Sequence, residues 1–262
     1  MKIEANLPGP VKDGKRSRNR RYTKLLGLKG PDKCGNGLPL AMVGGGPSLN
    51  DRLEDLRNWP GDVWVVCGAF QYCLAQGIDG VFFNVDPQPS AAPMCIGAKK
   101  AVVSTCNDPS VLDTLEQSGA DIRVFKTGGM GGSGTAVTLV PVLGLMLEYP
   151  SISFFGCDGS YKDRTHSYAN IPYGQVLKVQ VGDEVFTTSY PLLSQAVELS
   201  KAMRWIPDRL VNESGGLLEA LVNSEDGDYD IIALNYKEAM NIVDADGRPL
   251  HETHRIVKYT GA

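Results

Sequence analysis

A chain of 262 residues with 42% hydrophobic residues is long enough to bury the core of one large domain. Its formal net charge of −4 gives no global reason to expect a nucleic-acid-binding protein. No run approaches the roughly 18 apolar residues that span a bilayer, and the first ten residues contain no apolar signal core, so we expect a cytoplasmic protein without a membrane span. The six cysteines form no CxxC pair, so their spacing does not favour a structural zinc site.

The first 37 residues are polar and basic. Seven Lys and Arg residues between positions 12 and 24 face only Asp13 as a local counter-charge. Such a run is usually a solvated arm that repels itself and stays loose. The alternative is an arm that binds nucleic acid or another polyanion. Residues 1–37 are therefore predicted to be a basic arm outside the folded domain.

The apolar run 38–43 is the first predicted strand, and a helix is predicted from 50 to 57 with Ser48 as its cap. A strand, a glycine turn and a capped helix form the nucleotide-phosphate corner of a doubly wound fold. The turn matches neither GxGxxG nor a Walker loop, so a plain tight turn is the alternative. The turn consists of Gly44, Gly45, Gly46, Pro47 and Ser48.

Strands and helices alternate along the next hundred residues. This alternation predicts a Rossmann-like α/β fold with a mainly parallel sheet and helices on both faces. In such a sheet the ligand crevice lies outside the carboxyl ends of the strands. Asn84 and Asp86 stand at one such end. Further strands are predicted at 62–67, 80–84, 99–104, 121–125 and 151–155, with helices at 70–76 and 109–118.

A second glycine-rich turn precedes a long apolar helix that ends near Leu147. Glycines let the backbone approach a ligand closely, and the free N–H groups of a first helical turn suit an anion. Together with the first turn, it is predicted to hold the phosphates of a nucleotide. The residues concerned are Gly132, Ser133, Gly134 and Thr135.

The strand at 151–155 leads into a loop rich in chemically active side chains. Asp158 follows the strand, and His166 is the only histidine of the predicted crevice. The near-neutral pKa of an imidazole suits a general base that deprotonates an acceptor hydroxyl. Tyr161 and Tyr168 add two phenols.

The pattern changes after the loop. Residues 175–188 alternate around Gly182 and Asp183, which predicts a β-hairpin. An amphipathic helix at 190–205 and a short strand at 210–212 follow. We expect one nucleotide-binding transferase domain over 38–221, with a C-terminal extension over 222–262.

The order of these motifs resembles the motility accessory factor family, which groups with 6-hydroxymethylpterin diphosphokinase-like proteins. The pattern comprises a GPSL turn, a strand ending in Asp, a Gly-Ser helix start, G-x-D, a Thr-His loop, a hairpin and a Gly-Gly turn. The match spans about residues 38–221. Its positions here are Gly44–Leu49, Asp86, Gly132–Ser133, Gly156–Asp158, Thr165–His166, Gly182–Ser189 and Asn212–Gly216.

A more distant likeness is to bacterial sialyltransferases that use a CMP-sugar. That resemblance implies that Tyr161 and Tyr168 assist the departing nucleotide phosphate. A histidine is the base in that family, but His166 lies between the two tyrosines rather than well downstream of them. Both resemblances imply a nucleotide-using enzyme on a Rossmann-like fold.

We therefore expect a transferase, with a glycosyltransferase that uses a CMP- or UDP-linked sugar as the leading hypothesis. The alternative is a pyrophosphokinase that passes a diphosphate from ATP, ordinarily with Mg²⁺, to a hydroxymethylpterin-like substrate. Asp86 and Asp158 would be the metal ligands in that case. A non-catalytic nucleotide-binding or scaffold protein is the third possibility. The identity of the acceptor and the oligomeric state do not follow from the sequence.

Overall fold

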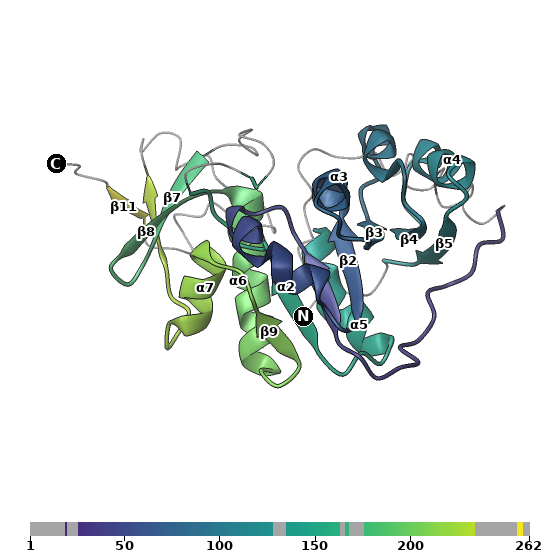
Figure 1. The fold of residues 1–262 in the computed structure, drawn as a ribbon. Coiled ribbons are helices and arrows are strands. Elements are labelled where there is room, and N and C mark those ends of the chain that lie inside the picture. The colour runs from purple at the N-terminus through teal and green to yellow at the C-terminus, as the bar shows by residue number, and fades with distance from the viewer. Residues whose placement is uncertain are drawn as a thin grey trace.

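A seven-stranded parallel sheet forms the centre of the structure (Figure 1). The computed structural model describes residues 19, 26–127, 135–162, 166–167, 176–233 and the backbone of 256–258. Every neighbouring pair of strands in this sheet is parallel, which confirms the predicted fold class. The strands are β1 (Leu40–Val43), β2 (Asp62–Val66), β3 (Val81–Asn84), β4 (Lys100–Ser104), β5 (Asp121–Phe125), β6 (Ile152–Phe155) and β9 (Leu210–Asn212).

The strand order reverses once. It runs β5-β4-β3-β2-β1-β6-β9, so the chain moves outward from β1 to β5 and then returns to place β6 on the other side of β1. Such a reversal is a topological switch point, and ligands of open α/β sheets bind outside the strand ends at this place. We therefore expect a ligand site at the carboxyl ends of β1 and β6.

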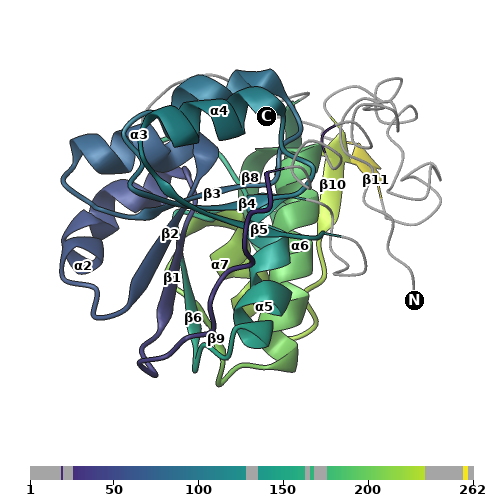
Figure 2. The same cartoon turned by 90° about the vertical axis from the view of Figure 1, so that its right-hand side faces the viewer.

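Helices cover both faces of the sheet, as Figure 2 shows for α3 and α4 on one side and α5 and α6 on the other. All four residues of β1 are fully buried, which explains its continuous apolar run. One face carries the 3-10 helices η1 (Pro47–Arg52) and η2 (Pro89–Cys95) with α2 (Leu53–Arg57), α3 (Cys67–Ala75) and α4 (Pro109–Gln117). The other carries α5 (Ala136–Met146), α6 (Tyr190–Trp205) and α7 (Gly216–Asn223).

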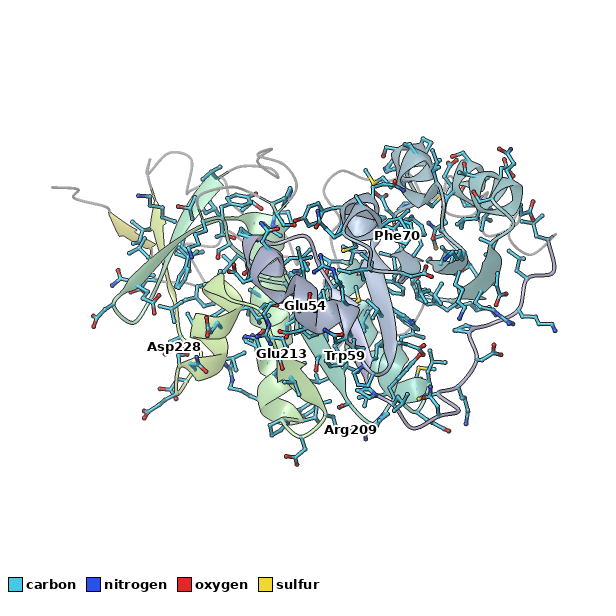
Figure 3. The ribbon with its side chains drawn as sticks, in the orientation of Figure 1. Glu54, Trp59, Phe70, Arg209, Glu213 and Asp228 are labelled. Carbon is cyan, nitrogen blue, oxygen red and sulfur yellow. The ribbon has the colours of Figure 1, made fainter. Side chains whose placement is uncertain are left out.

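Close packing on each face has an identifiable cause in the sequence. Phe70 of α3, which Figure 3 labels, packs edge-on against Phe82 of β3, with 5.3 Å between the ring centroids. On the opposite face, Gly144 lets α5 lie directly on the sheet, because a Cβ at that position would come within 2.5 Å of the Ile152 side chain. Pro141 also lies inside α5, and the predicted apolar helix is confirmed.

The start of the first helix differs from the prediction. The helical segment begins at Pro47, and Gly46 occupies the N-cap position without a side-chain cap. The prediction that Ser48 caps a helix from 50 to 57 is therefore wrong. The physical reason is that Pro47 favours the first helical position, and the Ser48 N–H donates to the Asp158 carboxylate at 3.3 Å.

A second, smaller sheet lies beside α6 and α7 (Figure 1). Its strands are β7 (Val176–Val181), β8 (Glu184–Ser189), β10 (Asp230–Ala233) and β11 (Ile256–Lys258), in the order β11-β10-β7-β8. The antiparallel pair of β7 and β8 confirms the predicted hairpin. In the part of the chain that the structure describes, no helix combines the length and apolar character that crossing a membrane requires.

Candidate active site

A cavity of about 370 Å³ opens at the carboxyl ends of β1, β2, β3 and β6, and we call it the switch-point cavity. It lies where the strand order reverses, as the fold leads one to expect. The predicted site residues that line it are Gly44, Gly45, Gly46, Asn84, Asp86, Thr135, Asp158 and His166.

The glycine turn after β1 binds the segment after β6. The Gly44 N–H donates to the Phe155 carbonyl and the Gly46 N–H donates to the Gly156 carbonyl, each at 2.7 Å. A Cβ on Gly46 would stand 1.8 Å from Oδ2 of Asp158, so this position has room only for glycine. These N–H groups were predicted to bind a phosphate. In the structure they join the carboxyl ends of β1 and β6 instead.

Asp158 is the centre of that junction. It is 4% exposed, and its two carboxylate oxygens accept the Ser48 N–H at 3.3 Å and the Gly215 N–H at 3.2 Å. Burial raises the pKa of the Asp158 carboxyl, while hydrogen bonds from Ser48 and Gly215 act in the opposite direction. Asp158 therefore ties the first glycine turn to the turn before α7, and it also lines the cavity.

The turn before α7 is held by further bonds. The Ser214 hydroxyl accepts the Cys157 N–H at 2.8 Å and donates to the Phe154 carbonyl at 2.9 Å. Glu213 forms an ion pair with Arg52 of η1, and Figure 3 labels Glu213 together with Glu54 of the adjoining α2. The Gly-Gly turn of the sequence pattern thus supports the end of β6 from outside the cavity.

The start of α5 has a different character. Oγ1 of Thr135, the N-cap residue, accepts the Thr138 N–H at 3.3 Å. The N–H groups of Ala136 and Val137 belong to the first helical turn, which has no intrahelical acceptor for them, and both residues line the cavity. The positive end of the helix dipole lies at the same place. This wall can therefore bind an anion.

The end of β3 contributes an amide and a carboxylate. Oδ1 of Asn84 accepts the Asp86 N–H at 3.0 Å, and Oδ1 of Asp86 accepts the Gln88 N–H at 2.9 Å. Asn84 is 1% exposed. Both side chains are thus fixed by local bonds while they line the cavity.

His166 lies over the first glycine turn. The next residue, Ser167, is buried, and its N–H donates to the Gly45 carbonyl at 3.1 Å. This bond holds the histidine at the cavity wall. The first turn therefore positions the predicted base.

Other predicted residues are not brought to the cavity. Tyr161 is 9% exposed, its N–H donates to the Thr187 carbonyl of β8 at 2.7 Å, and it does not line the cavity. Pro47 and Ser48 do not line it either. Gly132, Ser133, Gly134 and Tyr168 lie outside the described residues, as does the basic arm apart from Asn19 and residues 26–37.

The structure adds lining residues that the sequence did not single out. Cys67 starts α3, and burial together with the Asp86 charge raises the pKa of its thiol to about 12, so it stays protonated at neutral pH. Gln195 of α6 is 8% exposed and lines the opposite side. Neither residue belongs to a recognisable motif, because a strand end and an amphipathic helix do not mark single lining positions.

The described residues do not form a preformed cage of three or more ligands for a Mg²⁺ ion. Magnesium prefers octahedral oxygen coordination, with carboxylates among the ligands. Asp86 and Asp158 both line the cavity, but each already accepts backbone N–H groups. Within the described ranges, no three His, Cys, Asp or Glu side chains gather where they could hold a metal.

Comparison with known proteins shows a shared fold. No protein-family model matches the chain, and no curated protein matches it. A solved structure described as a MAf glycosyltransferase from Magnetospirillum magneticum AMB-1 superposes with a TM-score of 0.55 and 16% sequence identity. The match covers 78% of this chain and 36% of that one, so the likeness concerns about a third of the neighbour's length. It agrees with the resemblance to motility accessory factors that the sequence motifs indicated.

Proposed function

We propose that the protein is a nucleotide-dependent transferase that moves a sugar from a nucleotide-sugar to an acceptor hydroxyl. The observation that carries this proposal is the start of α5, whose first-turn residues Ala136 and Val137 line a cavity at the switch point of a parallel sheet. The shared fold with a protein described as a glycosyltransferase supports the same reaction class.

In this proposal the donor lies along the carboxyl ends of the strands. Asp86 and Asn84 at the end of β3 bind the ribose hydroxyls, because a carboxylate and an amide offer the acceptors that hydroxyl groups need. The first turn of α5 binds the phosphate through the N–H groups of Ala136 and Val137. No Lys or Arg among the described residues lines the cavity, so backbone N–H dipoles stabilise the negative charge of the phosphate.

The chemical step needs one base and one stabilised leaving group. The acceptor hydroxyl oxygen attacks the anomeric carbon of the sugar, and its proton passes to the His166 imidazole. The bond between the anomeric carbon and the phosphate oxygen breaks, and its electron pair stays on the phosphate. The N–H groups at the start of α5 stabilise that charge. Tyr161 has no role in this scheme, because it does not line the cavity.

Asp158 acts as a positioning residue in the scheme. Its buried carboxylate accepts two backbone N–H groups and thereby holds the first glycine turn against the turn before α7. The first turn in turn holds Ser167 next to His166. Asp158 thus influences the base through the backbone instead of contacting the substrate.

Isothermal titration calorimetry against CMP, UDP, CTP, ATP and GTP, with and without Mg²⁺, tests the proposal. Binding of CMP or UDP without a metal requirement is the expected result. ATP binding that depends on Mg²⁺ would instead favour the pyrophosphokinase. Absence of binding to every member of the panel would contradict a nucleotide-dependent enzyme, and a nucleotide that is bound but never turned over would favour a non-catalytic binding protein.

A further inference from the structure

Gln195 is a polar residue of the switch-point cavity to which the proposed mechanism gives no role. It lies on the second turn of α6, lines the cavity and is 8% exposed. Among the residues that the structure describes, none forms a hydrogen bond with its side-chain amide. Buried amides are nearly always hydrogen-bonded. The donors and the acceptor of an amide that reaches a cavity wall without a protein partner are therefore available to a ligand.

The packing of α6 explains how this amide reaches the cavity. Gly159, just after β6, has a φ of +66°, and a Cβ there would come within 2.5 Å of the Ala196 Cβ. The helix therefore lies directly on the strand end. Because α5 packs against both α6 and β1, Gln195 belongs to the same side of the cavity as the anion-binding start of α5.

The position of Gln195 along the cavity indicates which part of a donor it would meet. The cavity crosses the ends of β3, β2, β1 and β6, which are three strand spacings or roughly 14 Å. Asn84 and Asp86 stand at the β3 end, and Gln195 stands at the β6 end together with Asp158 and Ser160. With the nucleoside at β3 and the phosphate at α5, the group attached to the phosphate extends toward Gln195.

We propose that Gln195 forms the subsite for the transferred sugar, a proposal that rests on the proposed function. Its carboxamide has two donor hydrogens and an acceptor oxygen, which complement the hydroxyl or acetamido groups of a sugar. A neutral amide is a poorer match for a phosphate, which binds more strongly to charged donors. In this proposal Gln195 therefore binds the sugar, and the other walls of the cavity bind the nucleotide.

Calorimetry with matched ligand pairs tests this subsite. The pairs are CMP against CMP-N-acetylneuraminic acid and UDP against UDP-N-acetylglucosamine, titrated into the wild type and the Gln195→Leu variant. We expect the variant to bind the bare nucleotide within about twofold of the wild type. Its affinity for the nucleotide-sugar should fall about ten- to a hundredfold, because the sugar loses a hydrogen-bonding partner in a buried site.

Two further variants keep the result interpretable. Gln117→Leu makes the same change at an exposed position near the end of α4, and it should alter neither affinity. Gln195→Met retains an unbranched side chain, removes the amide and should reproduce the loss if Gln195→Leu does not fold.

Equal losses for nucleotide and nucleotide-sugar would place Gln195 at the nucleotide and overturn the subsite. Unchanged affinities for both ligands would overturn it as well. Failure of the wild type to bind any nucleotide would instead refute the proposed function, and the sugar subsite with it.

Discussion

The glycine turn after β1 and the start of α5 border the same cavity but use their backbone N–H groups differently. After β1, Gly44, Gly46 and Ser48 donate to the last residue of β6 and to the segment that follows it. At the start of α5, the Thr138 N–H donates to the Thr135 side chain, and Ala136 and Val137 line the cavity. The N–H groups of the first glycine turn therefore hold the site together, and those at the start of α5 are available to a ligand.

This difference shows what a glycine run in a sequence means. Glycine permits another group to approach the backbone closely, but its presence in the sequence does not identify that group. At Gly46 the approaching group is the Asp158 carboxylate of the same chain. The four predictions below separate the two turns, because changes near the first should affect catalysis or folding, and changes at the second should affect binding.

The largest expected effect concerns His166, which the first turn holds through Ser167. His166→Ala should lower kcat about 10²- to 10⁴-fold, the usual contribution of a general base. Nucleotide affinity should stay within about twofold, because α5 is untouched. Turnover of the donor identified by calorimetry provides the measurement, and His251→Ala is the matched control. Full activity of the His166 variant would remove the histidine from the mechanism.

Gly46→Ala should mainly affect folding. The added Cβ would collide with the Asp158 carboxylate and stand 2.8 Å from the Gly156 carbonyl oxygen. Such overpacking should cost about 3 kcal/mol of unfolding free energy, or roughly 6–12 °C in Tm. Gly35→Ala is the control, because a Cβ added there would have no atom within 4 Å, so its melting curve should not move. A normal Tm for Gly46→Ala would mean that the junction tolerates a side chain.

Ala136→Pro should weaken binding with little effect on folding. Proline suits the first position of a helix, and Thr135 has the extended φ and ψ that precede a proline comfortably. The substitution removes one N–H from the anion-binding turn, which should cost about 1.5 kcal/mol, or roughly tenfold in nucleotide affinity. Calorimetry and a melting curve are both required. Unchanged affinity at an unchanged Tm would show that the phosphate does not bind to α5.

The smallest effect is a pH dependence at the Asp158 junction. Burial raises the pKa of Asp158 in the folded state, so its contribution to stability is present at low pH and is lost as pH rises from about 3.9 through the raised value. Asp158→Asn cannot titrate, so the advantage of the wild type in Tm should be larger at pH 4 than at pH 8. Asp183→Asn, in the exposed hairpin turn, should leave the pH profile unchanged. The opposite trend would contradict the sign of the shift.

The sequence by itself determined the alternation of strands and helices, the glycine turn after β1 and the β7–β8 hairpin. These features depend on local rules, because apolar runs, alternation and glycine or proline positions act over a few neighbouring residues. The buried run of β1 and the carboxylate after β6 could therefore be placed correctly before any contact was known.

Only the tertiary structure decided which of these groups face the cavity. The strand order placed the end of β6 beside β1, and this contact took up the N–H groups of the first turn and buried Asp158. It also joined Tyr161 to β8 and brought Gln195 of α6 to the cavity wall. The physical reason is that hydrogen-bond partners and burial are set by contacts that are distant in the sequence. The partners of the first turn lie more than a hundred residues away, and the position of Gln195 depends on how α6 packs. A local sequence pattern contains neither kind of information.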